Sequence, residues 1–265
     1  MTNNLVDEIK EKGIVKIEHF LEKEEIENIT KIIRYYSAPK GHVNSQFAIG
    51  AKSLLANLLK FKFLKIKQSY NLISFQKKKG LKKIAEDYFD KETQLYTIDG
   101  YYSKKDKKDI LPWHTDQAYS GERNIVNFVN PNNFFLKFFI FLTDVAPGNG
   151  CVSYISRSHK IAYAIRDAIY KKKIQYQPYW NLIDFRKIIF DNKEYFFSTL
   201  NKNKLLDEFL DQTQYIENNV DTDKYDYSAK AGTIVIFDEG GVHRGTKATI
   251  SDRMVLRYFY SLKKK

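Results

Sequence analysis

Hydrophobic residues recur with helical periodicity in the first third of the chain. A short apolar stretch at residues 14–17 predicts a strand. The segment after it predicts an amphipathic helix whose apolar stripe consists of Ile26, Ile29, Ile33 and Tyr36. A second, leucine-rich helical face falls within residues 54–63. We therefore expect a strand and helices in residues 1–93.

After residue 93 the pattern changes to short apolar runs separated by turn residues. The corners PGNG at residues 147–150 and EGG at 239–241 are typical turn signals. Strands are predicted at 95–102, 136–145, 151–155, 233–237 and 254–262. Short strands with glycine-rich corners indicate a sandwich or jelly roll.

Residues 161–227 interrupt this β pattern with helical and mixed-polarity sequence. We interpret them as an insertion between strands and not as a second domain. The expected architecture is one domain over residues 1–265, mainly β with flanking helices. Its β core would consist of residues 94–160 and 228–265.

Composition narrows the class of protein. The 265 residues are 43% hydrophobic and 15% aromatic, which is enough apolar mass for one substantial core. The single Cys151 excludes a disulfide framework and a cysteine-based zinc ribbon. The first residues contain no secretory signal, and the longest apolar run, 134–142, is far shorter than the roughly 20 residues that cross a bilayer. We expect a cytoplasmic protein.

The net positive charge of the chain is compatible with several classes of binding partner. The chain has 44 Lys and Arg against 32 Asp and Glu, a formal charge of +12, and residues 28–85 contain no acid at all. This segment is interpreted either as a solvated basic surface or as a rim for a phosphate-bearing ligand. Nucleic acid is an alternative partner, since aromatic residues lie among the lysines, namely Phe61, Phe63, Tyr70 and Phe75. The apolar periodicity instead buries several of them.

The most specific chemistry lies in the sequence Pro112-Trp113-His114-Thr115-Asp116. In an extended segment, residues i and i+2 point to the same side, so His114 and Asp116 can bind one ion together. An imidazole and a carboxylate on one face are the start of a three-ligand iron(II) site. His243, after the strand-like GTIVIFDEGG, is the candidate third ligand. Arg253 opens the last apolar run, and its guanidinium fits a dicarboxylate.

These motifs resemble the phytanoyl-CoA dioxygenase family of iron(II)- and 2-oxoglutarate-dependent oxygenases. The similarity rests on GIVKIEHFLEKEEIENI near the N-terminus, WHTDQ at 113–117, LTDV with NGCVSYISRSHK within 142–160, and GTIVIFDEGGVHRGTKATISDR at 232–253. It covers most of the chain, but not the basic segment near residues 40–90 or the insertion after residue 160.

The resemblance implies a double-stranded β-helix, a cupin-like jelly roll. Its mouth would hold Fe(II) through His114, Asp116 and His243, with 2-oxoglutarate chelating the metal and O₂ as the second cosubstrate. Arg253 would bind the distal carboxylate of 2-oxoglutarate. Phe139 would pack near this cosubstrate, and Thr246 would add a hydroxyl contact.

The resemblance also bears on the reaction. Relatives that halogenate replace the metal-binding carboxylate with a small residue, so the retained Asp116 favours hydroxylation of a C–H bond with release of succinate and CO₂. The alternatives are a nucleic-acid-directed dioxygenase that uses residues 28–85 and a non-catalytic metal-binding barrel.

The substrate is expected to be a small anionic metabolite. Trp113 and Tyr119, with Tyr101 and Tyr102, are candidates for the pocket wall, and Arg123 and Arg157 are candidates for binding an anionic group. Arg157 stands where the family often has glycine, so the turn there is expected to differ in shape and to turn Arg157 toward a ligand. His159 belongs to the same turn motif, for which we expect a structural role.

Overall fold

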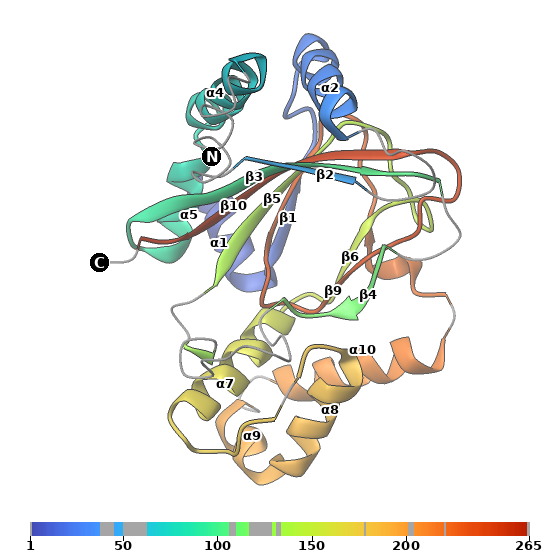
Figure 1. Ribbon diagram of the computed structural model, residues 1–265. Coiled ribbons are helices and arrows are strands. Elements are labelled where there is room, and N and C mark those ends of the chain that lie inside the picture. The colour runs from blue at the N-terminus through green and yellow to red at the C-terminus, as the bar shows by residue number, and fades with distance from the viewer. Residues whose placement is uncertain are drawn as a thin grey trace.

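The computed structural model describes residues 2–37, 45–49, 63–105, 110–116, 129–130, 134–177, 179–200, 204–219 and 221–263. Two antiparallel sheets face each other in its centre (Figure 1). The large sheet has the order β1-β8-β5-β10-β3-β2, with bounds Ile14–Ile17, Ile234–Asp238, Phe135–Phe141, Arg253–Leu262, Thr93–Ser103 and Ser45–Ile49. The small sheet has the order β4-β9-β6-β7, with bounds Leu111–His114, His243–Gly245, Val152–Tyr154 and Asp226–Tyr227. This is the jelly roll that the sequence predicts.

Among the described residues, four N-terminal helices belong to the outer side of the large sheet, with α2 and α4 above it in Figure 1. They are α1 (Thr2–Lys12), α2 (Lys23–Ser37), α4 (Phe63–Lys78) and α5 (Leu81–Phe89). Strand alternation explains this layer, because successive side chains point to opposite faces. Leu136, Phe138 and Ile140 of β5 pack with the helices, whereas Phe139 and Phe141 pack toward the small sheet.

A second group of helices lies below the small sheet in Figure 1. It comprises α7 (Ser158–Tyr170), α8 (Leu182–Asp191), α9 (Lys193–Leu200) and α10 (Leu205–Asn218), followed by the 3-10 turn Asp223–Tyr225. Their apolar faces form a core of their own, to which Ile155 and Val242 contribute from the ends of small-sheet strands. This layer covers the side of the small sheet that faces away from the large one.

Each strand expected from the apolar runs has a counterpart in the structure. β5 ends at Phe141, earlier than the predicted 145, and β10 begins one residue sooner than expected, at Arg253. The short strands β2, β7 and β9 and the helix α1 were not predicted, whereas β4 coincides with the extended segment expected at His114. The expected helix at 54–63 lies outside the described residues, apart from Phe63, where α4 begins. Within the described ranges, no helix is long and apolar enough to span a membrane.

Candidate active site

The two histidines of the WHTD and VHRG segments meet through strand pairing. β4 ends at His114, β9 begins at His243, and the two residues are partners in the antiparallel register. Asp116 follows β4 by two residues, and its N–H donates to the carbonyl of Glu239 at 3.3 Å. Thus residues that are more than one hundred positions apart in the sequence lie on one side of the small sheet.

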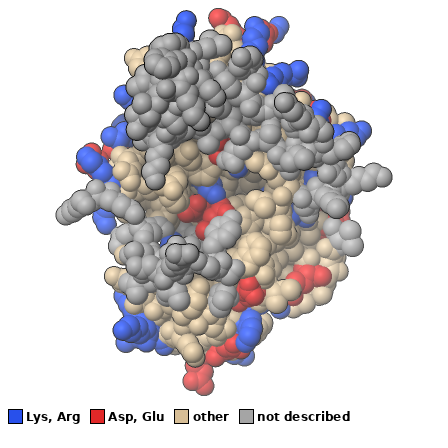
Figure 2. Space-filling model, in the orientation of Figure 1, with Lys and Arg blue, Asp and Glu red and all other residues tan. Residues whose placement is uncertain are grey.

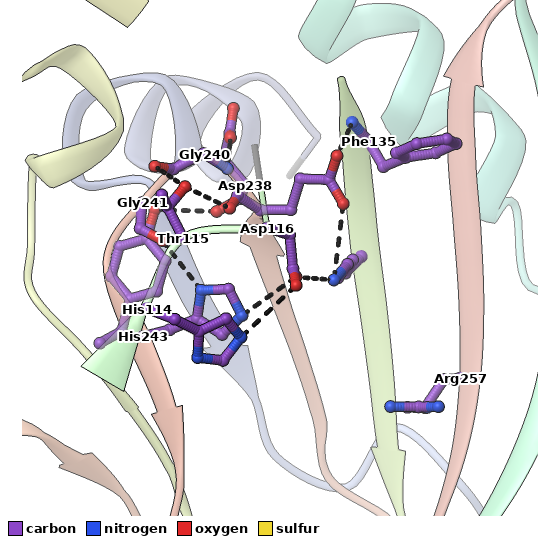
Figure 3. Close-up of polar contacts among 12 residues, drawn as sticks. His114, Thr115, Asp116, Phe135, Asp238, Gly240, Gly241, His243 and Arg257 are labelled. Carbon is purple, nitrogen blue, oxygen red and sulfur yellow. Dashed lines mark hydrogen bonds and ion pairs between the residues drawn. The ribbon is translucent and has the colours of Figure 1, made fainter. Parts of the chain in front are cut away.

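The three side chains converge on one point (Figure 3). His114 Nε2 lies 3.4 Å from Asp116 Oδ1, and His243 Nε2 lies 3.2 Å from Asp116 Oδ2. One potential ligand atom from each residue falls within 4.8 Å of the others. This spacing allows one ion to touch all three.

The tautomers of both imidazoles suit a metal. His114 Nδ1 lies 2.6 Å from the carbonyl of Pro112, and His243 Nδ1 lies 2.8 Å from the carbonyl of Gly241. A carbonyl can only accept, so each Nδ1 donates and each Nε2 keeps its lone pair. His114 Nε2 is buried without a hydrogen-bond partner.

The charges of the three groups also fit a cation. Burial and the neighbouring His114 lower the pKa of His243, which keeps its imidazole neutral. Burial alone would raise the pKa of Asp116, but Lys137 and His243 hold it well below its ordinary value. The carboxylate of Asp116 is therefore ionised where the Nε2 atoms of the two histidines face it, an arrangement that a divalent cation stabilises. Two His and one carboxylate are the ligand set of non-haem iron(II) oxygenases.

Arg253 is the strongest candidate for binding a cosubstrate. It is 4% exposed and lines the same cavity as the three ligands. Its guanidinium lies 5.4 Å from the ring centre of Phe141, its Nε has no hydrogen-bond partner, and no carboxylate of the described residues pairs with it. Burial and Arg257 lower its pKa to about 10, so it stays charged at neutral pH. A buried, unpaired guanidinium fits the distal carboxylate of 2-oxoglutarate.

The cavity measures about 500 Å³ and lies between the sheets. Figure 2 shows a hollow on this face with acidic and basic side chains inside it. Phe139 and Tyr101 line the cavity, as expected for residues near the cosubstrate and the pocket wall. Its rim includes Tyr96 and Leu111, both of which are exposed.

Several candidate residues lie elsewhere. The Thr246 hydroxyl is buried and donates to the carbonyl of Cys151 at 3.2 Å, outside the cavity lining. The Tyr102 hydroxyl donates to Asp252 at 2.8 Å. Trp113 packs edge-on against Tyr225, toward the helical layer. Tyr119 and Arg123 lie outside the described residues.

Arg157 does not face the cavity. Its side chain forms ion pairs with Glu11 at 3.1 Å and Glu208 at 2.7 Å, so it connects α1 to α10. Its φ of 68° lies in the left-handed region that glycine favours. Arg157 thus adopts the backbone conformation that glycine would have at this position. Because its side chain is held by two glutamates away from the cavity, the prediction that it contacts a ligand is wrong. His159 is buried, and its Nε2 lies 3.2 Å from the carbonyl of Lys10, in keeping with a structural role.

Sequence reasoning missed five charged residues of the cavity, namely Asp99, Lys137, Glu239, Arg244 and Arg257. Arg257 forms a two-point ion pair with Asp99, at 2.5 and 2.8 Å, and Lys137 lies between Asp116 and Glu239. Two signals were available in the sequence. Arg257 is four residues from Arg253 on one strand and hence on the same face, and Lys137 interrupts an otherwise apolar run.

Known structures with this fold bind iron and 2-oxoglutarate. HygX from Streptomyces hygroscopicus, solved with nickel and 2-oxoglutarate, is 11% identical with a TM-score of 0.58, covering 99% of this chain and 88% of that one. The carbocyclase SnoK of nogalamycin biosynthesis is 17% identical with a TM-score of 0.57, covering 99% and 84%. The epimerase SnoN, solved with Fe³⁺, α-ketoglutarate and nogalamycin RO, is 12% identical with a TM-score of 0.55, covering 98% and 83%. No curated protein sequence matches the chain.

The family model that matches the sequence, together with the fold and the site, defines an Fe(II)- and 2-oxoglutarate-dependent oxygenase. The sequence model of phytanoyl-CoA dioxygenase (PhyH) matches residues 9–254, which include all three metal-ligand candidates and Arg253. The chain belongs to the phytanoyl-CoA dioxygenase family.

Proposed function

We propose that the protein hydroxylates an unactivated C–H bond of a small anionic metabolite and releases succinate and CO₂. One observation carries this proposal: the three metal-ligand candidates and the unpaired Arg253 line one cavity. The cavity volume of about 500 Å³ is in the range of small-molecule sites.

Different residues of the cavity would bind the metal and the cosubstrate. His114, Asp116 and His243 would hold Fe(II) from one side, which leaves the opposite side open to other ligands. Arg253 would bind the distal carboxylate of 2-oxoglutarate and fix its direction. The rings of Phe139 and Tyr101 line this part of the cavity and would exclude water from it. When bound, iron and 2-oxoglutarate supply the activation of O₂ that the oxidation of carbon requires.

The charge of the cavity supports an anionic substrate. The lining contains three acidic residues and four basic ones, namely Asp99, Asp116, Glu239, Lys137, Arg244, Arg253 and Arg257. Burial raises the pKa of Glu239 to about 8, so two ionised carboxylates remain in the lining at neutral pH. Arg244 is also paired at 3.5 Å with Asp226, which lies outside the lining. Bound Fe²⁺ and the 2-oxoglutarate dianion cancel each other, so the lining keeps one positive charge in excess. An anionic group on the substrate would balance it.

The basic segment at 28–85 supports a nucleic-acid substrate less well than the cavity supports a small anionic one. Lys82 pairs with Glu86 and Lys83 with Asp87 along one helix, as on an ordinary solvated surface, and the half-buried Lys79 pairs with Glu25 at 2.7 Å. The ring of Phe75 packs against the core, although Tyr70 is 68% exposed. The side chains of Phe61 and Phe63 lie outside the part of the chain that is described.

A substrate screen tests the proposal. The protein is incubated with Fe(II), 2-oxoglutarate and O₂, with one set of phosphorylated or carboxylated metabolites and a second set of their uncharged analogues. We expect succinate release to rise only with an anionic compound, to give a product one oxygen atom heavier, and to vanish in His243→Ala. A product of unchanged mass would indicate epimerisation, and a loss of two hydrogens would indicate ring closure. Either would overturn hydroxylation, and an equal response to uncharged analogues would overturn the anionic substrate.

A further inference from the structure

Lys137 is an unusual residue for its position. It lies in the middle of β5 within the run FFLKFFIFL, and its side chain is only 10% exposed. Removing an ammonium group from water is energetically unfavourable unless other groups compensate for it. An aliphatic residue could pack at this position of the strand without that unfavourable desolvation. The presence of a lysine here therefore needs a structural or functional explanation.

The compensation comes from Asp116 and Glu239. Lys137 Nζ contacts the Asp116 carboxylate directly and lies 3.5 Å from Glu239 Oε2. Glu239 is fixed in turn, because its Oε1 accepts the N–H of Phe135 at 3.1 Å. The carbonyl of the same Glu239 accepts the N–H of Asp116. Glu239 therefore holds both the lysine and the backbone of the metal-ligand candidate.

The groups that contact Asp116 come from two different sheets. His114 and His243 belong to the small sheet, whereas Lys137 belongs to the large one. Figure 3 shows both imidazoles on the same side of the Asp116 carboxylate. The Asp116 carboxylate is thus contacted by the two imidazoles of the small sheet and by the ammonium group of Lys137 from the large sheet.

We propose that Lys137, anchored by Glu239, is a positioning residue that fixes the Asp116 carboxylate for iron binding. The inference rests on the proposed function, since it assumes that His114, Asp116 and His243 hold Fe(II). Asp116 lies beyond the end of β4, where no strand pairing fixes its side chain. Ligand atoms must be held within about 0.5 Å of their productive positions, which a second contact achieves.

Positioning and simple electrostatics predict opposite results when Lys137 is removed. A cation beside the site repels Fe²⁺, so if Lys137 acted through its charge alone, Lys137→Met would bind the metal more tightly. If Lys137 positions Asp116, the same variant loses affinity, because the carboxylate is free to turn away. The sign of the change therefore decides between the two.

The test is a metal titration without 2-oxoglutarate. We expect Lys137→Met to bind Fe(II) under anaerobic conditions roughly 10- to 100-fold more weakly than the parent protein. The visible spectrum of the Co(II)-loaded variant should change, because the carboxylate is no longer fixed. Lys137→Arg keeps a donor and should recover most of the affinity, and Glu239→Gln should lose affinity in the same direction. Equal or tighter binding by Lys137→Met would overturn the proposal.

The controls separate positioning from general damage. Lys79→Met is a matched variant, since Lys79 is 18% exposed and pairs with Glu25 at 2.7 Å outside the cavity; it should bind metal like the parent. If Lys137→Met does not fold, the double variant Lys137→Met/Glu239→Gln, which leaves no unpaired buried charge on either residue, replaces it with the same expected loss. A parent protein that binds no iron would refute the proposed function, whereas a parent that binds iron no better than Lys137→Met refutes only the positioning role.

Discussion

At the scale of single residues, two backbone carbonyls determine what the site can bind. Pro112 and Gly241 each accept a hydrogen bond from an imidazole Nδ1, so both Nε2 atoms present lone pairs to the Asp116 carboxylate. Local sequence predicted His114, Asp116 and His243, because their spacing and strand context are visible in the chain. Lys137 and Glu239 were missed, since their importance arises from contacts across the two sheets.

Arg253→Met should separate cosubstrate binding from metal binding. The substitution removes a buried cation that touches none of the three metal-ligand candidates, so the affinity for Fe(II) should stay unchanged. The affinity for 2-oxoglutarate should fall by roughly 2–5 kcal/mol, the usual effect of removing one partner of a buried charge pair. Isothermal calorimetry with Ni(II) in place of iron measures both constants. Unchanged 2-oxoglutarate affinity would refute the role of Arg253.

His159 should make stability depend on pH. Burial lowers its pKa below the ordinary 6.5, so the folded protein favours the neutral imidazole. Below pH 6.5 the unfolded chain binds the proton more readily, and stability falls as the pH falls toward the folded pKa, by at most about 1.4 kcal/mol per pH unit. His159→Gln keeps a donor toward Lys10 and should flatten this dependence in urea denaturation between pH 7 and 5. An equally steep dependence in the variant would count against this explanation.

At the scale of elements, short strands carry the chemistry. β4 and β9 have four and three residues, and their pairing brings His114 opposite His243. Such short strands offer little alternation to detect in sequence, and β9 follows β4 by more than one hundred residues. The long strands β3, β5 and β10 could be predicted because each has seven residues or more and is rich in aromatic and aliphatic side chains.

The end of α1 is held in place by close packing at Gly13. This residue has φ of +81°, and a methyl group there would lie 2.5 Å from His159 Nδ1 and closer still to the Tyr154 hydroxyl. Gly13→Ala should therefore destabilise the protein by about 2–4 kcal/mol, from backbone strain and steric overlap together. Gly80→Ala is the matched control, with φ of +70° and nothing within 4 Å, and should cost only the strain. Equal losses in chemical denaturation would show that the packing at Gly13 is unimportant.

At the scale of the whole molecule, the site joins the two sheets. The histidines come from the small sheet, and Arg253 and Lys137 come from the large one. The sequence predicted this architecture because apolar alternation, glycine corners and family motifs agree with one another. It could not predict how the helical layer packs, since α8 and α9 bury their faces against other helices and not against the sheets.

Ligands that bind between the sheets should stabilise the whole fold. At 100 times the dissociation constant, a ligand adds about 2.7 kcal/mol to the free energy of unfolding. For a domain of this size that corresponds to a rise in Tm of roughly 5–10 °C. Differential scanning calorimetry with Ni(II) and 2-oxoglutarate should show this rise in the parent protein and not in His114→Ala. A rise of the same size in the variant would mean that the metal binds elsewhere.

The most direct test of the account is an anaerobic titration of Fe(II) and 2-oxoglutarate into the purified protein, followed by visible absorption. We expect the weak charge-transfer band of the iron–2-oxoglutarate chelate to grow to one equivalent of each. The same titration of folded His243→Ala should give no band. The absence of a band in the folded parent protein, or its persistence in His243→Ala, would contradict the assignment of this site.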